Sequence, residues 1–336
     1  MRSARCLSNK KRNENLYTTN SPILTYDTTT CLRGGAALWI MLGHLGKVTD
    51  FLWLRLFWKS NLLVVGAFFF FSGYGLVYSM KNKQNYFDHF ISKRILKILI
   101  PAYIVYLYSG VLVLCMEGVN SWQEIIKYIF LFNFMEKTNW YVIEIIFFYI
   151  LFYLLYKNLK CSVANRLLWV ATVLGIIISA LAGCGQAWIT SSICFPLGVL
   201  YYQNEERVNE VIRKYRVIIF LIMNIICVMC YFISTLPELP VLIQNGVFKN
   251  MASVGFCIIL LEVPDIVSVK NRITNFLGII SMELYLVHCV HYTYFHKFIG
   301  TGWLYFIVVI TSSVFMSYIL HLVMEIFNRK IVLWSN

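Results

Sequence analysis

Residues 31–47 read CLRGGAALWIMLGHLGK, an apolar run with an arginine near its start and a histidine near its end. Arg33 and His44 are eleven residues apart, which on a helix corresponds to roughly three turns plus 20° and to about 16 Å along the axis. Both side chains therefore leave such a helix on the same side, with the imidazole deep in an apolar layer. The run predicts a membrane helix that carries a guanidinium and an imidazole along one line.

Each of these two residues also has a simpler interpretation. An arginine in the first turn of a membrane helix commonly anchors that helix to the lipid headgroups, and a buried histidine commonly hydrogen-bonds to a neighbouring helix. Ionisable side chains inside membrane segments are costly, however, and tend to mark pathways or chemistry. The occurrence of Arg33 and His44 on one stripe of one helix therefore favours a functional site.

The composition of the whole chain is that of a membrane protein. Of its 336 residues 59% are hydrophobic and 13% are charged, and the apolar residues occur in runs of about twenty, the length that crosses a bilayer as a helix. The formal net charge of +13 lies mostly between these runs, so it does not indicate nucleic-acid binding. Most of the ten cysteines lie inside apolar runs, which argues against a disulfide framework.

We predict an all-α integral membrane fold with about ten transmembrane helices. The expected organisation is a basic polar cytoplasmic tail over residues 1–30, a polytopic membrane domain over residues 31–328 and a short cytoplasmic C-terminus over residues 329–336. The predicted spans are residues 32–47, 61–80, 96–116, 139–157, 167–183, 187–202, 217–235, 246–263, 274–294 and 302–326.

The distribution of lysine and arginine orients these spans. With Arg33 set aside, 21 of these residues fall in the segments predicted to be inside and 7 in those predicted to be outside. Cytoplasmic loops carry an excess of positive charge, so both termini are predicted to be cytoplasmic. We expect a multi-pass protein of the cell membrane, with a bacterial plasma membrane as its location. The lipid bilayer is its expected partner, and a homo-oligomer is compatible with the sequence.

A cluster of basic residues stands where the third predicted span begins. Lys93, Arg94 and Lys97 lie along one edge of the entering helix, and Pro101 is expected to bend that helix or to start it afresh. Taken singly, such cations determine topology. Taken together, they also suit a ligand rich in phosphate.

Polar and aromatic residues mark two other spans. Ser72 and Gly73 interrupt the second span, where glycine permits the close approach of another helix and serine can bond to backbone or substrate. The fourth span opens with Trp140 and Tyr141. It also carries Glu144, which either orients the imidazole of the first span or faces the outer interface.

The remaining histidines of interest lie in the last two spans. Tyr285 and His288 stand near the end of the ninth span, and His288 is interpreted either as part of a site or as a packing hydrogen bond. His288 and His291 could bind a metal together, but the sequence suggests no further ligand at a matching turn, so we predict no metal site. His321 is predicted to be solvated or interfacial.

In their order along the chain, these segments resemble the membrane-bound acyltransferase-3 family, whose members include O-acetyltransferases of O-antigen and peptidoglycan. The resemblance covers about residues 25–330 and rests on the R-x10-H of Arg33 and His44, Phe70-Phe71-Ser72-Gly73, the R-x-x-K-x-x-x-P-x-Y of residues 94–103, Trp140-Tyr141, the YLxH of residues 285–288 and Glu325. It implies that Arg33 and His44 form the catalytic signature. The chain departs from the family at Lys97, where arginine is common, and in having no proline after Glu325.

The chemistry of acyl transfer is consistent with these residues. Transfer from a thioester to a hydroxyl needs a base that works near pH 7, a stabiliser of the oxyanion and an anchor for the coenzyme A phosphates. An imidazole, with an unperturbed pKa of about 6.5, suits the first role, and a guanidinium suits either of the others. We expect His44 to act either as the base or as the carrier of the acyl group. Arg94, Lys93 and Lys97 are expected to contact the phosphates of acetyl-CoA, the expected donor.

We therefore predict an integral membrane O-acetyltransferase that moves an acetyl group from cytoplasmic acetyl-CoA to a hydroxyl of a cell-surface polysaccharide or a lipid-linked glycan. The residues expected to bind substrate or support the site are Ser72, Trp140, Tyr141, Glu144, Tyr285 and His288. The alternative is a non-catalytic transporter or polysaccharide-export component, whose buried charges would line a path. Paired helix interruptions in two related halves would favour that alternative, and the sequence shows no such pairing.

Overall fold

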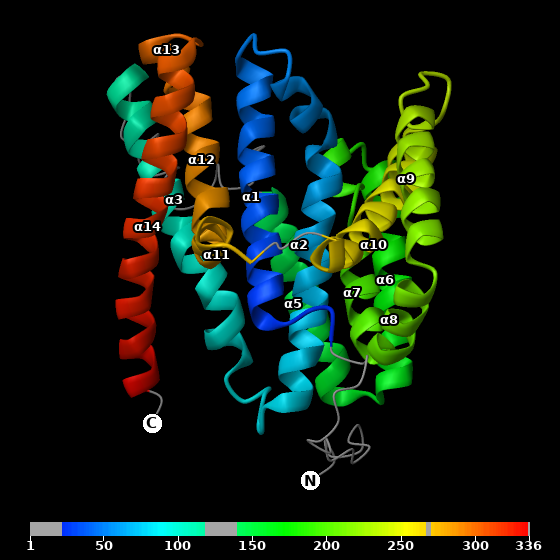
Figure 1. The fold of residues 1–336 in the computed structure, drawn as a ribbon. Coiled ribbons are helices and arrows are strands. Elements are labelled where there is room, and N and C mark those ends of the chain that lie inside the picture. Colours follow the sequence, from blue (N-terminus) through cyan, green and yellow to red (C-terminus); the bar gives the residue numbers. More distant parts are fainter. Residues whose placement is uncertain (1–21, 118–139, 267–269, 335–336) are drawn as a thin grey trace. The chain divides into compact units, whose positions relative to one another are not determined.

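The computed structural model describes residues 22–117, 140–266 and 270–334 of the chain. Within these residues the fold is helical throughout and contains no strand, as the sequence predicted (Figure 1). The helices are α1 (Tyr26–Val48), α2 (Leu54–Asn82), η2 (Ile91–Ile95), α3 (Leu96–Glu117), α5 (Trp140–Asn158), α6 (Cys161–Leu181), η3 (Gln186–Trp188), α7 (Cys194–Gln203), α8 (Glu205–Lys214), α9 (Arg216–Ile233), η4 (Leu242–Lys249), α10 (Asn250–Ile266), α11 (Arg272–Ile279), α12 (Ser281–Tyr294), α13 (His296–Ile299) and α14 (Trp303–Trp334).

Seven helices in the described part of the chain are long and apolar enough to cross a membrane, and α11 with α12, bent by 79°, would make an eighth. The prediction of an integral membrane protein is thereby confirmed, whereas the count of ten spans and the side of the termini stay predictions. The two predicted spans outside this set are α1 and α7. In place of the span predicted over residues 187–202, α7 has only ten residues, or about 15 Å, which is half of a hydrocarbon core.

α1 begins earlier than the sequence suggested. The hydroxyl of Thr25 accepts a hydrogen bond from the backbone N–H of Thr28 at 3.2 Å, which is how a threonine caps a helix N-terminus. Asp27 in the first turn and Lys47 in the last turn both complement the helix dipole. Residues 26–30 of the predicted tail are therefore helical, and residues 1–21 lie outside the described part.

The chain folds into two compact units, and three of the five boundaries between them fall inside α1, α2 and α5. Unit 1 comprises residues Met1–Leu32, Leu62–Phe90 and Phe147–Asn271, and unit 2 comprises residues Arg33–Asn61, Ile91–Ile146 and Arg272–Asn336.

In unit 1, glycines allow the backbones of α2 and α7 to pack closely against each other. A Cβ atom on Gly73 of α2 would overlap the backbone oxygen of Phe195 in α7, and a Cβ atom on Gly198 of α7 would overlap the backbone oxygen of Phe70 in α2. Each helix therefore needs a glycine where the other's backbone passes. The role predicted for Gly73, to permit close approach of a neighbouring helix, is confirmed, and this is the small-residue packing typical of membrane helices.

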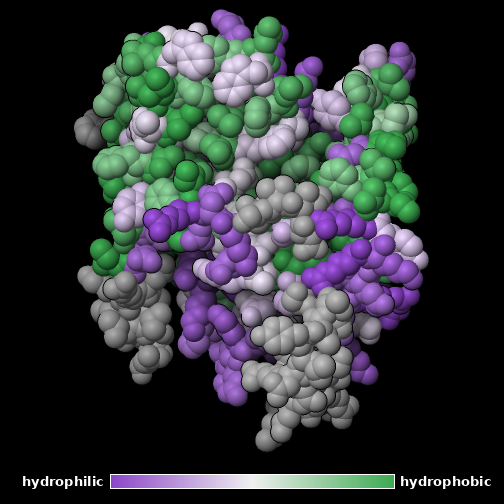
Figure 2. Space-filling model, in the orientation of Figure 1, coloured by the Kyte–Doolittle hydropathy of each residue, from purple (hydrophilic) through white to green (hydrophobic). Residues whose placement is uncertain are grey.

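Unit 1 also presents a face suited to lipid. α9 and α10 lie side by side, and Figure 2 shows hydrophobic side chains gathered over α9, with hydrophilic ones over α8 at its start. The exposed apolar residues of α9 are Val217, Ile218, Leu221, Ile222, Ile225, Val228, Met229 and Phe232. An exposed apolar surface of this length on one helix is expected where the solvent is hydrocarbon.

Unit 2 is built around α3, α12 and α14, which lie side by side (Figure 1). α12 and α14 run antiparallel, because His291 contacts Ser313 while Glu283, eight residues earlier, contacts His321, eight residues later. Gly34 of α1 packs directly against the backbone of α11 at Thr274. α1 is thus held within this unit over its apolar, glycine-bearing stretch.

The reciprocal glycine contact predicts a position-specific cost in unit 1. Gly73→Leu and Gly198→Leu should each destabilise the protein by about 1–3 kcal/mol or more, because the added side chain must push apart two helix backbones. The measurement is the thermal unfolding midpoint in detergent. Gly75→Leu is the matched control on α2, since nothing lies within 4 Å of a Cβ atom at Gly75. Equal losses at residues 73 and 75 would contradict the packing described.

Candidate active site

His44 of unit 2 lies one turn before the end of α1 and is surrounded by aromatic rings. Its ring stacks on that of Tyr292, with centroids 4.8 Å apart and planes inclined by 24°, and on that of His288, at 5.1 Å and 16°. Trp58 of α2 lies 5.8 Å away at a tilt of 51°. His44 is partly buried, whereas His288 is only 1% exposed. The imidazole of His44 is therefore held by rings on several sides.

A chain of hydrogen bonds fixes which nitrogen of His44 carries the proton. His288 Nδ1 lies 2.7 Å from the carbonyl oxygen of Leu284; a carbonyl only accepts, so Nδ1 of His288 donates. In a neutral imidazole the other nitrogen then has the lone pair. His288 Nε2 lies 2.8 Å from His44 Nδ1, so it accepts a hydrogen bond from His44.

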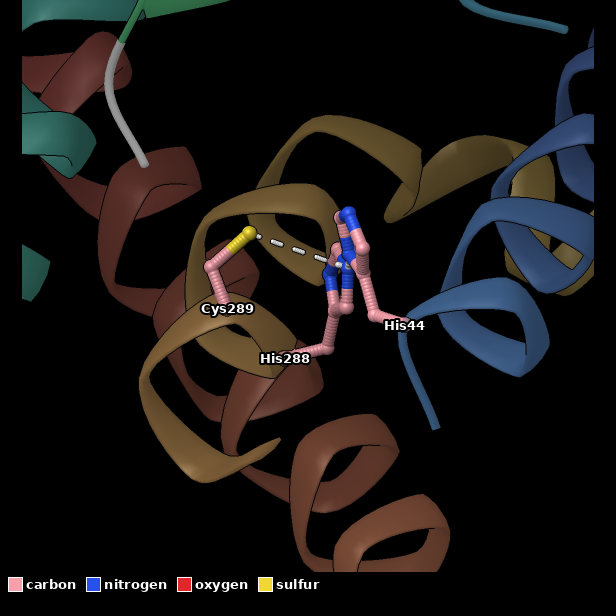
Figure 3. A group of neighbouring side chains, drawn as sticks. All are labelled: His44, His288 and Cys289. Atoms are coloured by element: carbon pink, nitrogen blue, oxygen red, sulfur yellow. Dashed lines mark hydrogen bonds between the residues drawn. The ribbon is translucent and has the colours of Figure 1, made fainter. Parts of the chain in front are cut away.

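The consequence is a free lone pair on the far side of His44. With Nδ1 donating to His288, Nε2 of a neutral His44 is unprotonated and can accept a proton or attack a carbonyl carbon. Figure 3 shows the two rings lying against each other between α1 and α12, with the thiol of Cys289 beside them. This is the arrangement of an oriented base, in which a second group sets the tautomer of the first.

Further aromatic residues extend this cluster towards α5. Tyr285 packs edge-on against His288 at 5.8 Å, and Tyr141 packs edge-on against Tyr285 at 5.1 Å. Trp140 in turn contacts Tyr141 at 6.1 Å. The structure thus brings together five of the residues singled out in the sequence: His44, His288, Tyr285, Tyr141 and Trp140.

Glu144 lies on the same side as these tyrosines. It is 7% exposed, stands one turn along α5 from Tyr141, and its carboxyl group acts electrostatically on Tyr285. The group that orients His44 through Nδ1 is His288. Glu144 is therefore buried beside the tyrosines that support His288, and both interpretations of its role stay predictions.

The basic residues lie on α1 before the ring cluster and at the start of the helix formed by η2 and α3. Arg33 is partly buried, and the ten residues between it and His44 are all helical, so the offset of about 16 Å along α1 holds. Lys93 and Lys97 are exposed and Arg94 is partly buried, all on η2 or the first turn of α3. Their helix continues through Pro101, so it does not start afresh there.

A contact on α3 gives the position of these cations relative to α12. The hydroxyl of Tyr108 lies 3.1 Å from Nε2 of His291, three residues after His288. Lys97 precedes Tyr108 by eleven residues, which is about 16 Å of helix. Along α1 and along α3, positive charge therefore precedes the ring cluster by similar lengths.

Ser72 belongs to unit 1, unlike the other predicted site residues. It is partly buried on α2, next to the Gly73 that packs against α7. Its surroundings are therefore those of a helix–helix contact within unit 1.

Two polar contacts between α12 and α14 were not predicted. His291 is fully buried, with Nδ1 3.0 Å from both Ser312 Oγ and Ser313 Oγ. His321 donates from Nδ1 to Glu283 Oε1 at 3.0 Å and has Glu325 3.8 Å from Nε2. His321 is partly buried and has a partner on another helix, and its assignment as solvated or interfacial stays a prediction. Ser313, His321 and Glu325 share one face of α14 at multiples of four residues, and this spacing was the available signal.

A known protein family matches most of the chain, including the ring cluster. The family model Acyl_transf_3, described as an acyltransferase domain, matches residues 29–322. The chain belongs to the acyltransferase-3 family. The matched region runs from the first helical turns of α1 into α14 and includes every residue of the ring cluster. No curated protein and no solved structure matches the chain. The resemblance seen in the sequence is thus confirmed, and the protein is a membrane acyltransferase.

The pairing of Glu283 with His321 predicts thermodynamic coupling in this acyltransferase. Glu283→Gln should destabilise it by about 1–3 kcal/mol, because a partly buried imidazole loses its charged partner, and His321→Gln should cost a similar amount. The double variant should cost less than the sum, with a coupling of at least about 0.5 kcal/mol, measured by unfolding in detergent. Glu325→Gln is the control, expected to cost under about 1 kcal/mol because Glu325 is exposed. Strictly additive losses would rule out the pair.

Proposed function

We propose that this acyltransferase is an O-acetyltransferase of the plasma membrane. It takes acetyl groups from cytoplasmic acetyl-CoA and places them on a hydroxyl of a cell-surface polysaccharide or a lipid-linked glycan. The observation that carries the proposal is the hydrogen bond from His44 Nδ1 to His288 Nε2, because it leaves a lone pair on the other nitrogen of the R-x10-H histidine. Membership of an acyltransferase family supports bond formation over a purely transporting role.

His44 supplies the base in this proposal. Its Nε2 accepts the proton of the acceptor hydroxyl while the oxygen attacks the thioester carbon. The imidazolium that forms keeps its Nδ1–H bonded to His288, whose own Nδ1–H is bonded to the Leu284 carbonyl. His288 thus acts as a positioning residue, comparable to the third member of a catalytic triad. The same lone pair could carry the acetyl group as acyl-histidine.

The basic residues bind the donor in this proposal. Coenzyme A has phosphates at one end and its thioester at the end of a long flexible arm. The cations at Arg33, Lys93, Arg94 and Lys97 precede the ring cluster by about 16 Å or more along α1 and α3. Such an offset suits phosphate contacts at one level and the thioester at the level of His44. Arg33 could instead stabilise the developing oxyanion.

The acceptor is expected to contact the aromatic side of the cluster. Trp140, Tyr141 and Tyr285 present rings and phenol groups next to His288, and such surfaces combine apolar area with hydrogen-bonding groups. Both properties suit a sugar ring.

The proposal predicts that purified protein transfers labelled acetyl from acetyl-CoA and that this depends on His44. His44→Ala and Arg33→Ala should lower kcat/KM by about 10²–10⁴, the range for a lost general base or charge stabiliser. His288→Ala should lower kcat with a smaller change in KM. Matched controls are the exposed His89→Ala and Arg207→Ala. Turnover at the wild-type level in His44→Ala would overturn the proposed mechanism.

A second prediction concerns the donor phosphates. Arg94→Ala should raise KM for acetyl-CoA by about tenfold or more and leave kcat nearly unchanged, because it removes a charge-assisted contact made equally in the ground and transition states. Acetyl-pantetheine lacks the nucleotide phosphates, so the variant and the wild type should use it equally well. Equal losses with both donors would place Arg94 outside the donor-binding site. Arg207→Ala again serves as the control.

A further inference from the structure

Three potential metal ligands meet at the His44 cluster. His44 Nδ1, His288 Nε2 and Cys289 Sγ all lie within 4.8 Å of one another, and they are brought together from α1 and α12 (Figure 3). Two imidazoles and one thiolate are ligands that Zn²⁺ prefers. The spacing of His288 and His291 had suggested no thiol at a matching turn. The thiol belongs to the residue next to His288, and the second imidazole comes from α1.

Two of the three distances between the ligand atoms are close to those of a tetrahedral site, and the third, from His44 Nδ1 to Cys289 Sγ, is within 4.8 Å. With Zn–N near 2.0–2.1 Å and Zn–S near 2.3 Å, neighbouring ligand atoms stand roughly 3.3–3.6 Å apart. His288 Nε2 lies 3.7 Å from Cys289 Sγ and 2.8 Å from His44 Nδ1. The two nitrogens would need to separate by about 0.5 Å, the difference between sharing a proton and sharing a metal ion.

The surroundings of His288 already suit a ligand. A metal-bound histidine usually donates its other N–H to a carbonyl or carboxylate, which aims the remaining lone pair at the metal. His288 donates Nδ1–H to the carbonyl of Leu284 at 2.7 Å. The lone pair of its Nε2 is therefore aimed at the point where His44 Nδ1 and Cys289 Sγ converge.

We propose that His44, His288 and Cys289 bind one Zn²⁺-like ion, which replaces the proton shared by the two imidazoles. The ion bonds to His288 Nε2, to His44 Nδ1 and to Cys289 Sγ. The thiol releases its proton to solvent, and the proton of His44 moves from Nδ1 to Nε2. The thiolate neutralises one of the two positive charges of the ion, and a fourth position stays open for water.

A metal ion bound at this site would prevent His44 from acting as a base. Once Nδ1 of His44 holds the metal, Nε2 carries the proton and has no lone pair to accept one from a hydroxyl. The ion would therefore act as a reversible inhibitor of acyl transfer. This consequence rests on the proposed function, whereas metal binding itself does not.

The experiment titrates detergent-solubilised protein with Co²⁺ alone and follows the thiolate-to-cobalt charge-transfer absorption in the near ultraviolet. Wild-type protein should bind one equivalent with this band. Cys289→Ser should remove the band, and His288→Ala should weaken binding by at least about tenfold. The matched control is the double variant Cys227→Ser/Cys230→Ser, which removes the Cys-x-x-Cys pair of α9 and should keep the band. Helical circular dichroism and the unfolding midpoint check that each variant is folded.

Two outcomes would overturn the proposal. One is a folded wild-type protein that binds no stoichiometric Co²⁺. The other is a band that persists in Cys289→Ser or disappears in the α9 double variant. As a second readout, Zn²⁺ should inhibit acetyl transfer by the wild type, and the inhibition constant should rise at least about tenfold in Cys289→Ser, relative to that variant's own activity without metal. If the protein transfers no acetyl group, the cobalt titration still decides the metal site.

Discussion

The hydrogen bond between His44 and His288 is the contact on which the site depends. It joins α1 to α12 across 244 residues of sequence, at 2.8 Å. It also determines the chemistry, because the carbonyl of Leu284 fixes the proton on His288, and His288 then fixes the proton on His44. A peptide carbonyl in a helix is a fixed acceptor. The orientation of the proposed base is therefore inherited from the backbone of α12 through two imidazole rings.

Close helix packing makes such a contact possible. Gly34 lets α1 approach the backbone of α11, and Gly46 lets it approach Leu54 at the start of α2. In a membrane, helices gain little from burying apolar surface against each other, so small residues and polar contacts determine which helices meet. The antiparallel pair α12 and α14 follows the same rule, with His291 and His321 each bonded across the interface.

The features that the sequence could predict are those that lie within one helix. The shared side of Arg33 and His44, the close approach at Gly73 and the helical, membrane-spanning character all follow from spacing and hydropathy. The partner of His44 does not, because nothing in the spacing of α1 encodes a residue on α12. The contact between Glu283 and His321 was not predicted for the same reason, because the two residues lie on different helices.

The short length of α7 has a different cause. Residues 187–202 are apolar enough on average to suggest a span, but their first seven residues include Thr190, Ser191 and Ser192, which are buried polar groups before the helix begins at Cys194. Mean hydropathy measures how apolar a segment is and does not show at which residue a helix begins, here Cys194.

The long separation between His44 and His288 also affects how the protein is made. α1 leaves the ribosome before α12, so His44 is synthesised well before its partner exists. During that interval the imidazole has no fixed tautomer, and no truncated chain ending before α12 can complete the site. The proposed base therefore stays unoriented until α12 has been inserted and has packed against α1.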